Sequence, residues 1–381
     1  MKINNQGNWE NIKNRVVIVS EEMDTSVFSE SEKELISRFQ EQKKDVTSVN
    51  DLESNLILVK SNESAEKMRM HGASVRSMVN NDVESIAVSG SADDSFHLTE
   101  GLLLANYQFL KYFKEEEREK KENKLGIIEL SSSVTAESSE ELLSIYEAVS
   151  WSRTMVNEPV SYLNAEQFAA EMKALAENAP LEVSVLEKTQ LESLKMGGIL
   201  AVNQGSIDPP TFTIFEYKPE NAKNEKPIVL VGKGVVYDTG GLSLKPTPNS
   251  MDLMKIDMGG AACVAGAVYL AALQKLPVHI ITLVPATDNR PGLNAYAPGD
   301  IVTMFDGTTV EVRNTDAEGR MLLADALAYS NKYDPELVID AATLTGAAVR
   351  ALGDFASCVM GNADDTYFQQ LEEASAACHE R

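Results

Sequence analysis

The sequence predicts an α/β fold, with a small N-terminal α/β domain and a larger C-terminal α/β domain that has a mixed, mostly parallel central sheet. Short apolar runs alternate with stretches of helical periodicity, which is typical of parallel sheets covered by helices. The length of 381 residues suits two or three domains, and 43% hydrophobic residues is ample for large cores. The expected divisions are residues 1–135, a linker helix within residues 136–160, and residues 161–381.

The N-terminal domain is expected to contain short strands with helices between them. The strand candidates are the apolar runs Val16–Val19, Leu56–Val59, Ile86–Val88 and Leu125–Leu130. The helix candidates are Ser29–Gln42, Ala65–Val79 and Leu98–Phe113, the first with Ser29 or Ser31 as its N-cap. Because strands alternate with helices, we expect a mostly parallel sheet. His71 and His97 are isolated, so we expect them in packing or surface positions.

A long helix is predicted where the two domains meet. Glu137–Val156 carries apolar residues at close to helical spacing, and Pro159 ends it because proline disfavours helix in the residue before it. Ala165–Ala179 is then predicted to be an amphipathic helix, and Ile199–Asn203 and Thr211–Tyr217 are predicted to be strands.

The C-terminal domain is centred on Ile228–Val231, an apolar run without polar alternation that predicts a buried strand of a parallel sheet. Two helices are expected after it, the alanine-rich and glycine-rich Met258–Gln274 and Gly319–Lys332. The further strand candidates are Val278–Pro285, Asp300–Phe305, Val310–Val312 and Leu337–Ile339.

The composition disfavours several classes of partner. With 34 basic and 58 acidic residues the formal net charge is −24, which argues against nucleic acid and anionic membranes. No apolar signal region opens the chain, and no stretch is expected to span a membrane. Cys263, Cys358 and Cys378 lack metal-site spacing and suggest free thiols in a reducing compartment, so a cytoplasmic location is expected.

Two glycine-rich segments hold a set of charged residues suited to metal chemistry. The first segment contributes Lys233, Asp238, Lys245 and Asp257, and the second contributes Asp316, Glu318 and Arg320. Carboxylates are hard ligands for Zn, Mn, Mg or Co, and four of them can share two ions about 3.5–4 Å apart that activate a water. In an extended segment, a spacing of two would put Asp316, Glu318 and Arg320 on one face.

Each of these residues has a simpler interpretation when taken alone. Asp238 near glycines could be an ordinary turn residue, and the two lysines could be solvated surface groups. Arg320 could pair with Glu318 at a helix start. The methionines of the region, Met251, Met254 and Met258, are more often core residues than pocket walls. A functional site is favoured because all these residues occur together, with both glycine-rich segments in order.

Three segments resemble the leucyl aminopeptidase (cytosol aminopeptidase) family of dinuclear metallopeptidases: VGKGVVYDTGGLSLKP, MDLMKIDMGGAA and NTDAEGRM. The resemblance continues through DAATLTGA, from Asp340 to Ala347, and extends more weakly upstream to Trp151. Residues before Trp151 show little of the pattern, which fits a divergent N-terminal domain with a role in assembly or regulation. The C-terminal domain would then be the catalytic one.

The resemblance implies a role for each matching residue. The implied metal ligands are Lys233, Asp238, Asp257, Asp316 and Glu318, with Asp238 and Glu318 bridging both ions and Asp316 also giving its backbone carbonyl. The implied catalytic residues are Lys245 and Arg320, the latter holding a bicarbonate that acts as general base. The implied substrate-binding residues are Met254, Thr343, Leu344 and Gly346.

Elementary chemistry is consistent with these implied roles. Lysine ligates a metal only as a neutral amine, and since its ordinary pKa is about 10.4, dications must hold Lys233 deprotonated. A free ammonium on Lys245 could stabilise an oxyanion, and the planar fork of Arg320 matches a bicarbonate.

The resemblance predicts a metal-dependent aminopeptidase that releases N-terminal, preferably apolar (leucine-like) residues from peptides through a two-metal activated water. Two divalent ions are expected, Mn or Zn, with Mg or Co also possible, together with a homo-oligomer, a hexamer in the family. The alternative is a catalytically weak or inactive assembly or regulatory member of the family. A dinuclear phosphoesterase is disfavoured by the two lysines and NTDAEGR. The family domain continues past a position like Arg381, so we expect a truncated domain here.

Overall fold

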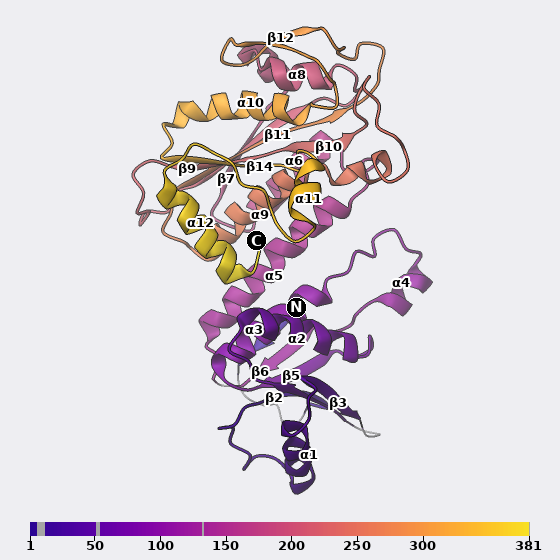
Figure 1. The fold of residues 1–381 in the computed structure, drawn as a ribbon, viewed down its shortest axis with the longest axis vertical. Helices are drawn as coiled ribbons and strands as arrows, with labels where there is room; N and C mark the ends of the chain where they lie inside the picture. The colour runs from indigo at the N-terminus through magenta and orange to yellow at the C-terminus, as the bar shows by residue number, and fades with distance from the viewer. Residues whose placement is uncertain (6–11, 51–53, 132, 381) are drawn as a thin grey trace. The chain divides into compact units, whose positions relative to one another are not determined.

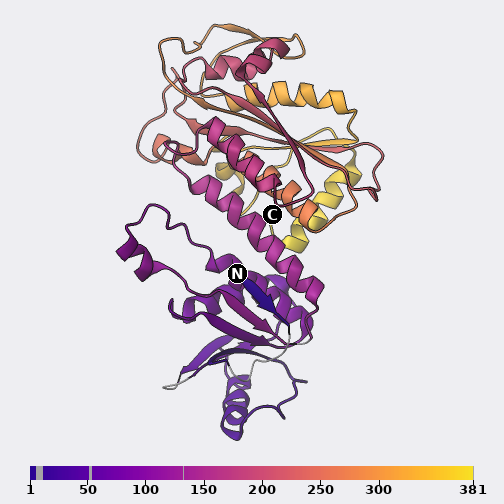
Figure 2. The same cartoon turned by 180° about the vertical axis from the view of Figure 1, so that it is seen from behind.

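The computed structural model describes residues 1–5, 12–50, 54–131 and 133–380, and these divide into two compact units, Met1–Ser150 and Trp151–Arg381 (Figures 1 and 2). Helix α5 (Ala136–Asn157) crosses the boundary between them and matches the predicted Glu137–Val156 closely. In both units helices cover a sheet of parallel or mixed strands, so the predicted α/β class is confirmed.

The first unit contains a sheet whose described strands follow the order β1-β6-β5-β2-β4-β3. All neighbours are parallel except the edge strand β3, which is antiparallel to β4. The strands are β1 (Lys2–Asn4), β2 (Asn14–Val19), β3 (Val46–Asn50), β4 (Asn55–Lys60), β5 (Ser85–Ser89) and β6 (Ile127–Leu130). The helices are α1 (Glu30–Gln40), α2 (Ala65–Met78), α3 (Ala92–Asn106) and α4 (Glu115–Lys121).

Local capping explains where the helices of this unit begin. Ser29 caps α1 in a reciprocal capping box with Glu32, which confirms the first of the two predicted caps. Ser91 caps α3 through the Asp94 amide, so this helix begins earlier than the predicted Leu98–Phe113, and it also ends earlier, at Asn106. Strands β1 and β3 were not predicted, because they are short and partly exposed and lack an apolar run. His71 is buried, as expected of a packing histidine.

The second unit is built on a mixed sheet of order β14-β9-β11-β8-β7, with β10 also paired to β11. Strands β14, β9, β11 and β10 are parallel, and β8 and β7 continue the sheet antiparallel. The strands are β7 (Glu182–Glu187), β8 (Thr211–Tyr217), β9 (Ile228–Gly232), β10 (Gly234–Asp238), β11 (Ile280–Asn289) and β14 (Leu337–Ala341). A separate hairpin joins β12 (Ile301–Thr303) to β13 (Thr309–Glu311).

Helices cover both faces of this sheet (Figure 1). On one face lie α6 (Ala165–Ala176) and α9 (Gly259–Leu273), and on the other α7 (Lys188–Leu194), α8 (Gly197–Asn203) and α10 (Gly319–Ser330). The central strand β11 is buried throughout and alternates between the two cores, with Ile281 and Leu283 in one and Val284 and Ala286 in the other. The remaining elements are the 3-10 turns η2 (Met251–Ile256) and η3 (Asn331–Tyr333) and the helices α11 (Ala347–Leu352) and α12 (Asp365–Cys378).

The predicted strand Ile199–Asn203 is wrong, because these residues belong to helix α8. A five-residue apolar run does not distinguish a buried strand from a buried helix turn. The deciding interaction comes from a distant part of the chain, since Asp325 of α10 accepts a hydrogen bond from the Ile199 amide at 3.0 Å. That carboxylate satisfies a free amide of the first helical turn, which local sequence could not reveal.

The expectation that no stretch could span a membrane is wrong when length and composition are the only criteria. Met251–Leu273 is long and apolar enough among the described residues, but 67% of its most apolar window is buried inside the unit. Its alanines and glycines pack against the sheet, as Met258–Gln274 was predicted to do.

The packing of β9 against α9 is expected to depend on Gly232. A Cβ atom there would lie 2.5 Å from the Ala261 Cα atom, so backbone would have to move. Gly232→Ala should therefore lower the free energy of unfolding by about 1–3 kcal/mol or more, measured by urea denaturation. Gly346→Ala is the matched control, because a Cβ atom there meets no atom within 4 Å. Equal stability of the two variants would contradict this packing.

Candidate functional site

The carboxyl ends of parallel strands bring the predicted residues to one edge of the second sheet. Lys233 follows β9 directly, and Asp238 is the last residue of β10, which pairs parallel with β11. After Asp238 the chain turns tightly, because the Asp238 Oδ1 atom accepts the Gly240 amide at 2.8 Å and both Gly240 and Gly241 have positive φ. This turn leads the chain to Lys245.

A buried cluster forms around the Lys233 ammonium. Its Nζ atom lies 2.7 Å from Asp257 Oδ2 and 2.9 Å from Glu318 Oε1. It also donates to the Thr343 carbonyl at 3.0 Å, and the Thr343 hydroxyl donates to Asp257 Oδ1 at 2.8 Å. The side chains of Lys233 and Glu318 are 2% exposed, so this is an ion pair with almost no water around it.

The electrostatics of this cluster are unbalanced, since one ammonium meets two carboxylates. Burial opposes the charge on Lys233, but Asp257 and Glu318 outweigh it and raise the pKa of the lysine. Burial also raises the pKa of both carboxyls, and neighbouring carboxylates add to that rise although Lys233 lowers it. With both carboxyls ionised the cluster carries one more negative charge than positive, and either a proton or a further cation would relieve this imbalance.

A second cluster forms around Lys245, which is less buried than Lys233. The Lys245 Nζ atom lies 2.9 Å from Asp238 Oδ2 and 2.6 Å from Asp316 Oδ1. Burial works against its charge, but the two carboxylates raise the pKa of Lys245. The side chain is 16% exposed, compared with 2% for Lys233, so Lys245 is the more accessible of the two ammonium groups.

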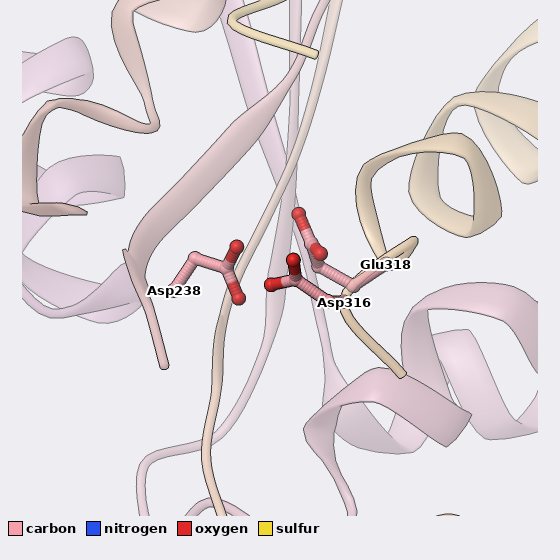
Figure 3. Close-up of side chains that lie close together, drawn as sticks. All are labelled: Asp238, Asp316 and Glu318. Atoms are coloured by element: carbon pink, nitrogen blue, oxygen red, sulfur yellow. The ribbon is translucent and has the colours of Figure 1, made fainter. Parts of the chain in front are cut away.

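The two clusters meet in a group of three carboxylates, Asp238, Asp316 and Glu318, drawn in Figure 3. One oxygen from each lies within 4.8 Å of the others, a spacing that oxygen ligands of a single divalent ion can have. Asp257 lies outside this group and is linked to Glu318 through Lys233. The all-oxygen donors and the unbalanced charge both fit hard divalent cations.

The reasoning that placed Asp316, Glu318 and Arg320 on one extended face is wrong. Asp316 lies in a turn, Glu318 is the N-cap residue of α10 with helical φ and ψ, and Arg320 is within the helix. Asp316 and Glu318 nevertheless converge, because the turn brings them together. Arg320 is exposed and forms no ion pair with any residue in the described ranges, and Glu318 pairs with Lys233 instead.

The candidate substrate-binding residues differ in their burial and in whether they contact the charged clusters. Thr343 contacts both Lys233 and Asp257. Met254 lies half-buried in η2, while Leu344 and Gly346 are exposed in the segment after β14. Met258 is fully buried, as expected of a core methionine.

Three residues next to the carboxylates were not predicted. The Asn289 side-chain amide donates to Asp238 Oδ1 at 2.8 Å, and the buried Tyr296 hydroxyl donates to the Thr315 carbonyl at 2.8 Å. Burial and the nearby carboxylates raise the pKa of Tyr296. A Cβ atom on Gly319 would lie 2.5 Å from Lys233 Cε, so glycine makes room for the lysine. Asn289 ends β11 at the same sheet edge, which is the one signal that could have identified it.

Comparisons with known proteins identify the family that the second unit resembles. The model of the "Cytosol aminopeptidase family, catalytic domain" matches residues 150–381. A "Probable cytosol aminopeptidase" of Chloroherpeton thalassium is 51% identical over 214 residues, covering 56% of this chain and 42% of that protein. A protein of the same name in Syntrophotalea carbinolica is 46% identical over 277 residues, covering 70% of this chain and 54% of that protein. The chain thus spans about half the length of these curated relatives.

A solved structure extends the similarity to both units. The "Bottromycin maturation enzyme BotP in complex with Mn" superposes with a TM-score of 0.82 at 29% identity, covering 97% of this chain and 80% of that chain.

Removal of the Lys233 ammonium should expose the charge imbalance directly. Lys233→Met leaves Asp257 and Glu318 buried without their cation, so in chelator the free energy of unfolding should fall by about 3–5 kcal/mol. Thermal or urea denaturation measures this.

Lys226→Met is the matched control, since Lys226 pairs with Asp334 at 2.9 Å but is 55% exposed. An exposed pair of this kind contributes only about 0–1 kcal/mol. If Lys233→Met were as stable as Lys226→Met, the buried pair would not hold the site together.

Proposed function

The chain belongs to the cytosol aminopeptidase family, and on this basis we propose that it is a metal-dependent aminopeptidase. The proposed reaction is release of N-terminal residues, preferably apolar and leucine-like, from peptides. The observation that carries the proposal is the group formed by Asp238, Asp316 and Glu318, with ligand atoms within 4.8 Å of one another at the carboxyl edge of the sheet. Sites of α/β proteins are commonly found at that edge.

Two divalent ions are the proposed cofactors, Mn or Zn, with Mg or Co as further candidates. The proposed ligands are Lys233, Asp238, Asp257, Asp316 and Glu318. Oxygen donors and uncompensated negative charge support hard dications, and the Mn complex named for the similar solved structure supports Mn. When bound, the ions would supply an activated water. Lys233 would have to lose its proton to join them as a neutral amine.

Lys245 is the proposed electrophilic residue. Its ammonium lies between Asp238 and Asp316 and is partly accessible, so it can face a peptide bound over the carboxylates. An ammonium aimed at the scissile carbonyl would stabilise the oxyanion that develops during attack. Without bound ions, Asp238 and Asp316 raise the pKa of Lys245 and so favour its charged form.

Arg320 is proposed to hold a bicarbonate that accepts a proton. Its guanidinium is exposed and without an ion-pair partner among the described residues, so its planar fork is available to a carboxylate-shaped anion. Arg320 also lies in the first turn of α10, where free amides favour an anion. Met254, Thr343, Leu344 and Gly346 are proposed to contact the peptide. A cytoplasmic homo-oligomer, a hexamer by family resemblance, is proposed as the working form, with the N-terminal unit in assembly.

Hydrolysis of leucine 4-nitroanilide tests the proposed activity. Turnover should require added Mn or Zn and disappear with chelator. Lys245→Met should lower kcat by about 10²–10³-fold while the protein keeps its metal, because only the developing charge loses its partner. Asp257→Asn should instead lower the number of ions bound, measured by elemental analysis of the purified protein.

Asp306→Asn provides the control, because Asp306 is an exposed turn acid between β12 and β13. Full activity of both site variants would refute the assignment. Intact metal binding without turnover in the parent protein would favour the catalytically inactive alternative.

A further inference from the structure

One uncharged residue connects the loop that follows Asp238 to the turn that bears Asp316 and Glu318. Thr315 is fully buried and immediately precedes Asp316. Its hydroxyl donates to the Gly240 carbonyl at 2.6 Å and accepts from the Ser243 amide at 2.7 Å. Its own amide donates to the Ser243 hydroxyl at 3.2 Å. These bonds link segments 72 or more residues apart in sequence.

The Thr315 carbonyl is held by two other side chains. It accepts from the Asn289 side chain at 2.9 Å and from the Tyr296 hydroxyl at 2.8 Å. The same Asn289 amide group donates to Asp238 Oδ1. The hydroxyl, amide and carbonyl of Thr315 therefore all form hydrogen bonds, and these bonds connect three segments next to the carboxylates.

The loop between Asp238 and Lys245 is shaped for this contact. Gly241 has φ +63° and a Cβ atom there would lie 3.0 Å from the Thr315 hydroxyl oxygen. Gly240 has φ +83° and a Cβ atom there would lie 2.8 Å from Asp316 Oδ1. Two glycines in the left-handed region thus permit a backbone approach that side chains would block.

We propose that Thr315 is a positioning residue whose hydroxyl fastens the Asp238–Lys245 loop to the turn bearing Asp316 and Glu318. This connection sets the separation of the carboxylates before any ion arrives. The inference rests on the proposed function for the identity of the ions, but the connection itself exists without them. Because Thr315 is fully buried, its effect on the reaction would be indirect.

The physical reason is that a buried hydroxyl acts here as both donor and acceptor. A valine has nearly the same shape but would leave the Gly240 carbonyl and the Ser243 amide unpaired. The loop would then move to find other partners. Groups that orient metal ligands in this way typically change affinity by about 10–100-fold when removed.

The test compares Mn²⁺ affinity by isothermal titration calorimetry in the full chain and in Thr315→Val, Thr315→Ser and Thr213→Val. Thr315→Val should bind Mn²⁺ about 10–100-fold more weakly. Thr315→Ser keeps the hydroxyl and should retain most of the affinity. Thr213 is the matched control, since it is also fully buried but its hydroxyl has no hydrogen-bond partner in the described structure. Thr213→Val should therefore bind Mn²⁺ like the parent.

Amide hydrogen exchange in the metal-free protein provides a second readout. The amides of Gly240, Gly241 and Lys245 donate to atoms other than those of Thr315. In Thr315→Val they should nevertheless exchange faster, because the whole loop is released, and in Thr315→Ser and Thr213→Val they should not. If the substitution removed only the bonds of Thr315 itself, the exchange rates of these three amides would stay unchanged.

The inference is overturned if Thr315→Val matches the parent in Mn²⁺ affinity, or if Thr315→Ser loses as much affinity as Thr315→Val. Should Thr315→Val fail to fold, Tyr296→Phe removes one bond to the Thr315 carbonyl and should weaken Mn²⁺ binding to a smaller degree. Parental affinity in Tyr296→Phe would then count against the proposal. If the parent binds no Mn²⁺, the proposed function fails. Hydrogen exchange alone then tests the role of Thr315, and unchanged exchange rates of the loop amides in Thr315→Val would overturn it.

Discussion

The candidate site of the second unit depends on ion pairs that compensate the charge of its carboxylates. Among the described residues, the carboxylates of Asp238, Asp257, Asp316 and Glu318 form ion pairs with two ammonium groups, those of Lys233 and Lys245. Carboxylates brought this close in a dry environment repel one another unless cations separate them. The two lysines hold the arrangement together, and the remaining negative charge would attract the proposed dications.

The sheet supplies the geometry that this compensation needs. Strands β9 and β10 run parallel to β11, so Lys233, Asp238 and Asn289 emerge at the same edge. Glycines then allow close approach at the points where side chains would collide. Gly319 leaves room for the Lys233 stem, and the positive φ of Gly240 and Gly241 lets the loop touch the turn before Asp316. Rigid strand ends thus position charges that the loops alone could not hold.

Much of this organisation could be predicted from the sequence, because burial leaves a periodic signature. The apolar runs at Ile228–Val231 and Thr211–Tyr217 became β9 and β8, and the α/β class followed from their alternation with helices. Prediction failed where a distant contact decides the outcome. Ile199–Asn203 is helical, since Asp325 satisfies its first turn.

The site was also only partly predictable. The charged residues of the two clusters were identified by their type and spacing, yet the reasoned geometry of Asp316 to Arg320 was wrong, because a turn and a helix start replace the expected extended segment. Thr315, Asn289 and Tyr296 are uncharged and carry no spacing pattern. Their importance arises from hydrogen bonds between segments far apart in the chain, which become visible only in three dimensions.

Anomalous scattering from crystals grown with Mn²⁺ would show whether the carboxylates hold metal ions. We expect two adjacent peaks among Asp238, Asp257, Asp316 and Glu318, with the Lys233 amine as a ligand and no longer an ion-pair partner. No peak at saturating Mn²⁺, with both lysines still bridging the carboxylates, would contradict it.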